Sequence, residues 1–230
     1  GLVADKDIAG MRVLMAGWSF SKRDVTYASA QSLLDTLGAD YDTRVTDLTQ
    51  ATERRHPFRL QQHVRDWPYS QRDAAYRAAA EASAQWQEAF DQQRAQLVLG
   101  LTEMDMGVLL EAVKGWEFCG EDAEFQAASQ LAKEMGPEFQ RLSKELTEGV
   151  ENMDVRRLRA ALAAWPFAPS TPVFTRAAAA EGEWAAEYDA TAAELAEGLA
   201  TRHVTRLREV AGDWRFWNLD PVVVEARQLC

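Results

Sequence analysis

The sequence predicts an α/β fold in which a short parallel sheet is joined to a large helical elaboration. Two observations favour this fold. In the first half of the chain, short apolar runs alternate with helical patterns, which is the order found in βαβ units. Ala is the most abundant residue and β-branched residues are few, so helices are expected to dominate the rest. A mainly α fold is the alternative that this composition also supports.

Four short segments have the apolar and β-branched character of strands. They are Arg12–Ala16, Thr43–Leu48, Leu97–Leu101 and Pro172–Thr175. Helical patterns separate the first three, so these three are expected to form the parallel sheet.

Helical spacing of apolar residues defines the remaining elements. The first predicted helix ends at Gly38, a typical C-terminal cap, and Gly136-Pro137 is expected to end another in the same way. After residue 119 the strand–helix alternation stops, and we see no internal repeat. This predicts an α/β portion at 1–118 and a helical portion at 119–230, with one continuous domain as the alternative. The predicted helices cover 24–37, 71–94, 125–135, 139–150, 155–165 and about 182–210.

Length and charge exclude several classes of function. The 230 residues suit one domain, alone or with an appendage, and the net charge of −11 argues against nucleic acid and against anionic membrane surfaces. No apolar run approaches the roughly 20 residues that span a bilayer. We therefore expect a cytoplasmic protein without nucleic-acid or membrane partners. Processed export and organelle import are alternatives.

The cysteines and histidines do not predict a metal site. The two cysteines, Cys119 and Cys230, are too few for a four-thiolate site, and the three histidines are scattered. One Glu-x-x-His spacing occurs, Glu53 to His56, but two arginines fill it and a proline follows. We predict no metal.

The loop after the first predicted strand is suited to binding phosphate. In an open α/β sheet, ligands lie beyond the carboxyl ends of the strands, and a helix N-terminus there attracts an anion. As an alternative, Ser21 and Asp24 only cap the following helix, and both roles are compatible. The candidate phosphate-binding residues are Ser19, Ser21, Lys22, Arg23 and Thr26.

Two segments resemble the flavodoxin-like NAD(P)H:quinone or FMN reductases. Segment 11–48 has a strand, a Ser-bearing loop, an amphipathic helix and a strand that ends in Asp-Leu. Segment 96–116 has a strand, the loop TEMDMG and a helix that contains Val-Lys-Gly-Trp. Together they cover a quarter to a third of the chain.

The resemblance implies an FMN cofactor and a redox activity. The first loop would surround the flavin phosphate, and Thr102, Met104 and Gly107 of the second would lie beside the isoalloxazine ring. The enzyme would pass hydride from NAD(P)H to a quinone-like or small electrophilic acceptor. The sequence assigns no catalytic residue to this reaction.

A second hypothesis is a non-catalytic subunit of a larger protein assembly, either helical or a degenerate flavodoxin-like protein. The Trp-rich C-terminal tail supports it, because Trp anchors dominate protein interfaces. A protein partner or a homodimer would then contact Trp214, Phe216 and Trp217. The alternative is that these rings fold back onto the core.

Overall fold

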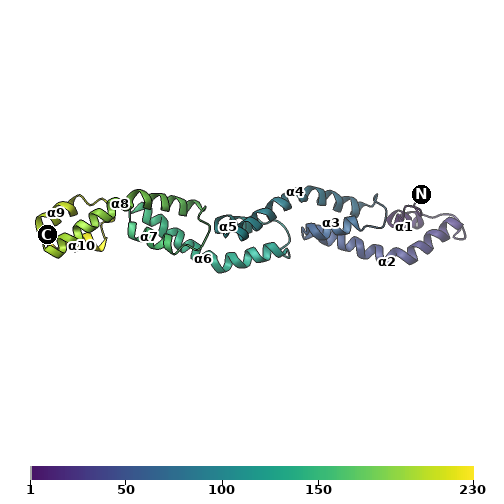
Figure 1. Ribbon diagram of the computed structural model, residues 1–230. Helices are drawn as coiled ribbons and strands as arrows, with labels where there is room; N and C mark the ends of the chain where they lie inside the picture. Colours follow the sequence, from purple (N-terminus) through teal and green to yellow (C-terminus); the bar gives the residue numbers. More distant parts are fainter. Residues whose placement is uncertain (1) are drawn as a thin grey trace. The chain divides into compact units, whose positions relative to one another are not determined.

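The computed structural model describes residues 2–230, and in this range the chain forms α-helices and no strand (Figure 1). The predicted α/β fold and its flavodoxin-like sheet are therefore wrong, and the mainly α alternative fits the structure. The helices are α1 (Ile8–Ala16), α2 (Val25–Glu53), α3 (Pro57–Arg65), α4 (Ala74–Glu103), α5 (Met106–Lys114), α6 (Ala123–Glu151), α7 (Val155–Ala163), α8 (Pro172–Thr201), α9 (Val204–Gly212) and α10 (Pro221–Leu229).

The helices belong to two compact units. The N-terminal unit comprises Gly1–Gln96 and Gly115–Gln126, and the C-terminal unit comprises Leu97–Lys114 and Ala127–Cys230. In the N-terminal unit, α2 packs against both α1 and α3. In the C-terminal unit, α8 packs against α7, α9 and α10, and the last two also contact each other. Among the described residues, no helix is both long enough and apolar enough to cross a membrane.

The segment 43–48 was predicted as a strand because of its threonines and valine, yet it lies inside α2. Each threonine hydroxyl there donates to the carbonyl four residues earlier: Thr43 to Ala39 at 3.0 Å and Thr46 to Asp42 at 2.8 Å. This local bond satisfies the hydroxyl without leaving the helix. The intrinsic β preference of Thr is weak enough for such bonds and for core contacts to override it.

The other three predicted strands are also helical. Residues 12–16 belong to α1, which begins where Asp7 accepts a hydrogen bond from the Gly10 amide at 2.7 Å. Residues 97–101 belong to α4, where Leu97 and Gly100 are buried but the residues between them are exposed, as on one face of a helix. Residues 172–175 form the first turn of α8, in which Pro172 needs no amide hydrogen bond.

Several predicted helix ends are wrong. Gly38 lies buried in the middle of α2, and Pro137 lies inside α6. The single helix predicted at 182–210 is two helices, because Arg202 adopts a left-handed conformation (φ 54°) between α8 and α9. Glycine and proline favour helix ends locally, but Gly38 and Pro137 do not end a helix here.

The structure shows an internal repeat, so the expectation of a chain without one is wrong. Helices of nine residues alternate with helices of 29 or 30 residues from α1 to α9, and α10 again has nine. In the numbering, equivalent residues lie 49 apart. This spacing places one tryptophan in each loop that leads into α2, α4, α6, α8 or α10: Trp18, Trp67, Trp116, Trp165 and Trp214.

The turn before each short helix repeats as well. Non-glycine residues with positive φ recur at the same spacing: Lys6, Arg55, Met104, Met153 and Arg202. The next residue donates its amide to the carbonyl five positions earlier, for example His56 to Ala51 at 2.9 Å and His203 to Gly198 at 3.0 Å. This is the Schellman arrangement, which satisfies the last carbonyls of a helix. The same bond joins Asp7 to Leu2 at 2.9 Å, so the first described residues already follow the repeat.

Candidate functional site

The five loops that carry the repeated tryptophans have a common structure. We call them Trp loops one to five (residues 18–24, 67–73, 116–122, 165–171 and 214–220). Each has an aromatic residue two positions after the tryptophan and an N-cap residue at its last position. The indole N–H donates to the carbonyl three residues later, at 3.3 Å in Trp18 and 3.2 Å in Trp67. Their sequences are WSFSKRD, WPYSQRD, WEFCGED, WPFAPST and WRFWNLD.

In Trp loops two to five, an aromatic residue of the preceding long helix completes a cluster of rings. In loop two this residue is Tyr41, with ring centroids 6.0 Å from Trp67 and 5.3 Å from Tyr69. In loop five it is Tyr188, at 5.7 Å from Trp214 and 5.4 Å from Phe216. Phe90 and Phe139 have this role in loops three and four. Edge-to-face contacts at these separations are favourable beyond the area they bury.

The two tyrosines also hydrogen-bond to the N-cap carboxylate. The Tyr41 hydroxyl donates to Asp73 at 2.6 Å, and the Tyr188 hydroxyl donates to Asp220 at 2.8 Å. Both carboxylates are buried, and each also accepts an amide hydrogen bond at a helix N-terminus. Burial, followed by these hydrogen bonds, raises the pKa of both tyrosines. The two pairs therefore join Trp loops two and five to the long helices that precede them.

The chain should lose stability at alkaline pH because the pKa of another tyrosine of these clusters, Tyr69, is raised in the folded state. Burial and the hydrogen bond to Asp40 raise the pKa of Tyr69 from 10.0 to about 12. The unfolded chain therefore releases the phenolic proton first, so the stabilisation is complete below pH 10 and is lost as pH rises toward 12. Unfolding in urea across this range should show a falling midpoint, and Tyr69→Phe should fall less steeply. An equal slope in the variant would contradict this assignment.

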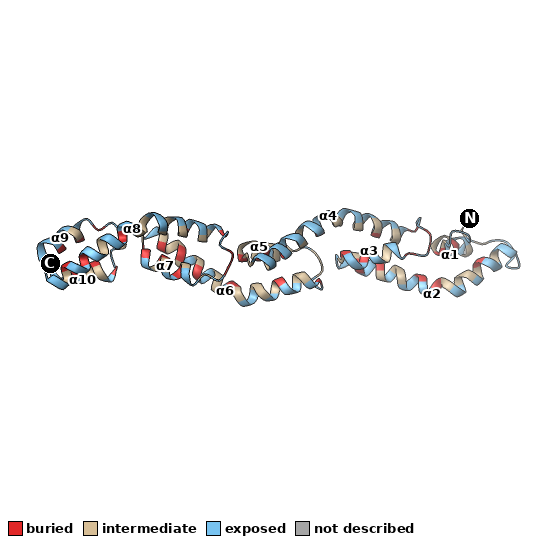
Figure 2. Cartoon of the chain, in the orientation of Figure 1, coloured by how far each residue is buried: buried red, intermediate tan, exposed pale blue. Residues whose placement is uncertain are grey.

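Within residues 2–230, no long helix covers Trp loop one in the way that one covers each of the other four loops. Phe20 is 77% exposed, whereas the equivalent Tyr69, Phe167 and Phe216 are 3–7% exposed. Asp24 is exposed as well, although the N-cap residues of the other four loops are buried. In Figure 2 the N-terminal end of α2 accordingly has the exposed colour. Trp loop one is therefore an exposed aromatic surface of the N-terminal unit. Its residue types are those that form the core in the other loops.

The predicted phosphate-binding residues lie in and just after Trp loop one. Ser19, Ser21, Lys22 and Arg23 are exposed in the loop, and Thr26 is in the first turn of α2. The predicted capping box is only partly confirmed: Asp24 is itself the N-cap and accepts from the Thr26 amide at 2.8 Å, whereas the Ser21 hydroxyl accepts from the Arg23 amide within the loop at 3.2 Å. No sheet edge accompanies them in the described residues, so the topology that suggested a phosphate site is absent.

The residues predicted to line the flavin ring lie around the end of α4. Thr102 is in the last turn of that helix, Met104 is the turn residue with φ 53°, and Gly107 is in the first turn of α5. Asp105 caps α5 by accepting from the Gly107 amide at 3.0 Å. These residues belong to the C-terminal unit and the phosphate-loop residues to the N-terminal unit. The loop TEMDMG is thus a repeat turn between two helices.

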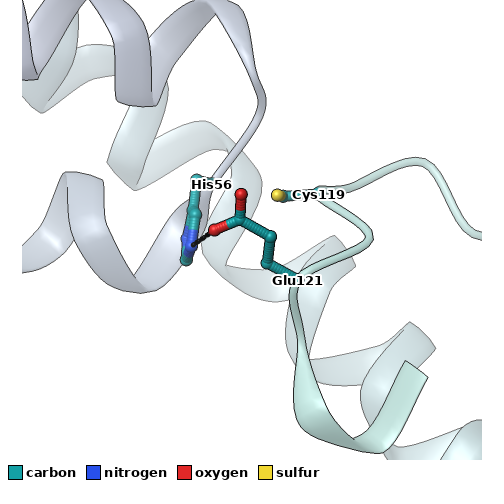
Figure 3. A group of neighbouring side chains, drawn as sticks. All are labelled: His56, Cys119 and Glu121. Atoms are coloured by element: carbon teal, nitrogen blue, oxygen red, sulfur yellow. Dashed lines mark ion pairs between the residues drawn. The ribbon is translucent and has the colours of Figure 1, made fainter. Parts of the chain in front are cut away.

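A second candidate site lies where the turn between α2 and α3 meets Trp loop three. His56, Cys119 and Glu121 place one potential metal-ligand atom each within 4.8 Å of one another, and Figure 3 shows them converging. His56 Nε2 lies 3.8 Å from Glu121 Oε2. The backbone holds the two segments together, because the Cys119 amide donates to the Arg55 carbonyl at 2.9 Å.

The charges of this cluster favour an ionic contact over a metal centre. Glu121 already pairs with Arg59 at 3.1 Å and with Arg54 at 3.8 Å. His56 Nδ1 accepts from the Arg59 amide, which leaves one ring nitrogen for a ligand. Desolvation, followed by the Arg59 charge, lowers the pKa of His56. A divalent cation would have to displace guanidinium groups and remain beside them, so the residues fit a cation poorly. The prediction of no metal stays a prediction.

The Trp-rich tail folds back onto the C-terminal unit. Trp214 and Phe216 are 6% and 3% exposed and belong to the core formed by α8, α9 and α10. Trp217 is half-buried, and its amide donates to the Met153 carbonyl at 3.4 Å. Of the three rings predicted to contact a partner, only Trp217 is therefore available in part.

Comparisons with protein-family models, with curated proteins and with solved structures find no match to this chain. The functional residues must therefore be judged from the chain itself. The sequence interpretation did not predict that Trp18, Phe20 and Asp24 form an exposed surface. The signal that identifies these residues is the 49-residue spacing of the tryptophans.

Proposed function

We propose that this chain is a non-catalytic helical-repeat subunit of a larger protein assembly. The observation that carries the proposal is the recurrence, every 49 residues, of a long helix, a short helix and a Trp loop. Within residues 2–230 this array exposes aromatic surface, as at Phe20, which is 77% exposed. The repeat also supports this role, because tandem helical units commonly provide binding surfaces.

The alternative is the FMN-dependent oxidoreductase, and titration with FMN separates the two functions. We expect the purified chain to be colourless and to leave the fluorescence of free FMN unchanged. We also expect no oxidation of NAD(P)H with a quinone acceptor. The proposed function would be refuted if the chain quenched FMN fluorescence stoichiometrically and Ser21→Glu abolished the quenching. That result would support the predicted phosphate site.

An apolar fluorescent dye provides a positive test of the exposed surface. Dye emission should increase with the wild-type chain and should fall in Phe20→Ser. Val25 is a matched control, because it is 81% exposed at a repeat position that is exposed in every repeat. Val25→Ser should therefore retain the dye signal. Equal losses in the two variants would argue against a defined binding surface.

A further inference from the structure

We infer that the contact between the α2–α3 turn and Trp loop three is an electrostatic latch that opens as ionic strength rises, while the equivalent contacts of the other repeats stay closed. We call such a contact a joint: it joins the turn before a short helix to the Trp loop that follows the next short helix. The inference is independent of the proposed function, because it concerns local opening within the N-terminal unit.

One backbone hydrogen bond is common to the joints of Trp loops three, four and five. The fourth residue of the loop donates its amide to the carbonyl of the turn residue that has positive φ. These bonds join Cys119 to Arg55 at 2.9 Å, Ala168 to Met104 at 3.1 Å and Trp217 to Met153 at 3.4 Å. The first joint belongs to the N-terminal unit and the other two belong to the C-terminal unit. Because the backbone bond is shared, the side chains distinguish the three joints.

A network of ion pairs crosses the joint at Trp loop three. Glu121 of the loop pairs with Arg59 at 3.1 Å and with Arg54 at 3.8 Å, and Figure 3 shows its side chain reaching from the loop toward the turn. Glu117 pairs with Arg55 at 3.2 Å. The three arginine side chains are 50–64% exposed, so dissolved ions reach them and screen the attraction. A single exposed pair contributes little, whereas a network of several charges contributes measurably.

The joints of Trp loops four and five do not have this set of charges. Ser170 and Leu219 are the repeat equivalents of Glu121. On the opposite side, Met104 and Met153 stand where the first joint has Arg55. Attraction between charges does not hold these two joints together, so salt should not open them.

Trp loop three also has less apolar burial and a more flexible backbone than the loops compared with it. Trp116 and Phe118 are half-buried, whereas the equivalent ring pairs of loops two and five are buried. Gly120 lies within the loop, whereas loops two and four contain proline, which restricts the backbone. The ion pairs therefore provide a larger share of what holds this loop in place.

Salt should act in the opposite direction on the rest of the chain. The net charge of −11 makes the folded chain repel itself, and screening reduces that repulsion. Added salt should therefore leave the uncharged joints unchanged or make them more stable. A joint that becomes weaker under the same conditions is identified by the sign of its response.

Hydrogen exchange of single amides, measured by NMR on the intact chain near neutral pH, tests the latch. The Cys119 and Ala168 amides report local opening of a charged and an uncharged joint, respectively. The comparison uses about 0.1 M and about 1 M NaCl, between which the Debye length falls from about 10 Å to about 3 Å. Protection of the Cys119 amide should fall about fivefold. Protection of the Ala168 amide should stay within about twofold or increase.

Variants of the loop carboxylate assign the effect to the ion pairs. Glu121→Gln should lower the protection of the Cys119 amide at low salt and should remove most of its salt dependence. Glu121→Arg should reverse the direction, because salt would then screen a repulsion from Arg54 and Arg59. Glu183→Gln is the matched control: this exposed residue of α8 carries the same charge, and the wild-type response should persist.

Three outcomes would overturn the inference. The first is an equal salt response of the Cys119 and Ala168 amides, and the second is a Glu121→Arg variant that responds in the same direction as the wild type. The third is a larger effect of sodium phosphate than of sodium chloride at equal ionic strength, which would assign the arginines to an anion-binding site instead of a screened latch. The FMN titration, which tests the proposed function, is unaffected by any of these results.

Discussion

Replacing Trp67 with Ala should destabilise the chain by about 3–5 kcal/mol, whereas the same change at Trp18 should cost less than about 1 kcal/mol. The two tryptophans occupy the same repeat position. Trp67 is 9% exposed and contacts three aromatic rings, including that of Tyr41 on the covering helix. No helix among the described residues covers Trp18, and the Phe20 ring beside it is largely exposed.

Urea unfolding followed by circular dichroism measures the difference. The two variants share the chemical change and the local loop structure, so a gap between them reports the contribution of the covering helix. Folded-state helix content at zero urea should be unchanged in Trp18→Ala. Equal costs for the two variants would mean that the Trp loops are not equivalent and would weaken the repeat as a guide to function.

The sequence predicted the helical character of most of the chain and some of its local chemistry. Ala-rich segments with apolar stripes are helices, and Asp24 caps the second one, although the capping box placed the N-cap at Ser21. Helix length was predicted poorly. Gly38 was expected to end a helix, but the Arg12 guanidinium donates to its carbonyl at 3.4 Å and also pairs with Asp42 within the same helix. Contacts between segments thus extend α2 past a residue that locally favours an end.

The repeat could have been predicted from the sequence, whereas the exposed surface could not. Five tryptophans at equal spacing are visible in the sequence, but the spacing is longer than any window used to judge helical or strand patterns. By contrast, Phe20 looks like Phe167 or Phe216 in its local sequence. The exposure of Phe20 depends on whether a helix packs over it, and the local sequence pattern carries no information about that packing.

Of the changes near the end of a long helix, where a short helix packs closely, Gly100→Val should be the most damaging. A Cβ on Gly100 would lie 3.0 Å from the N, Cα and Cβ atoms of Leu109 in α5. The clash involves backbone, so the two helices must separate, and the change should destabilise by about 3 kcal/mol. Only small residues, Ala51, Gly149 and Gly198, occupy the equivalent place in the other long helices.

Gly182 is the matched control, because it lies in the long helix α8 and a Cβ there meets no atom within 4 Å. Gly182→Val should change the free energy of unfolding by less than about 0.5 kcal/mol, since the gain in helix propensity is small. The urea midpoints of the two variants should therefore differ clearly. If Gly182→Val were as damaging as Gly100→Val, the cost would arise from valine in a helix. A large gap would show that close approach of the short helix, which the small residue permits, holds each repeat together.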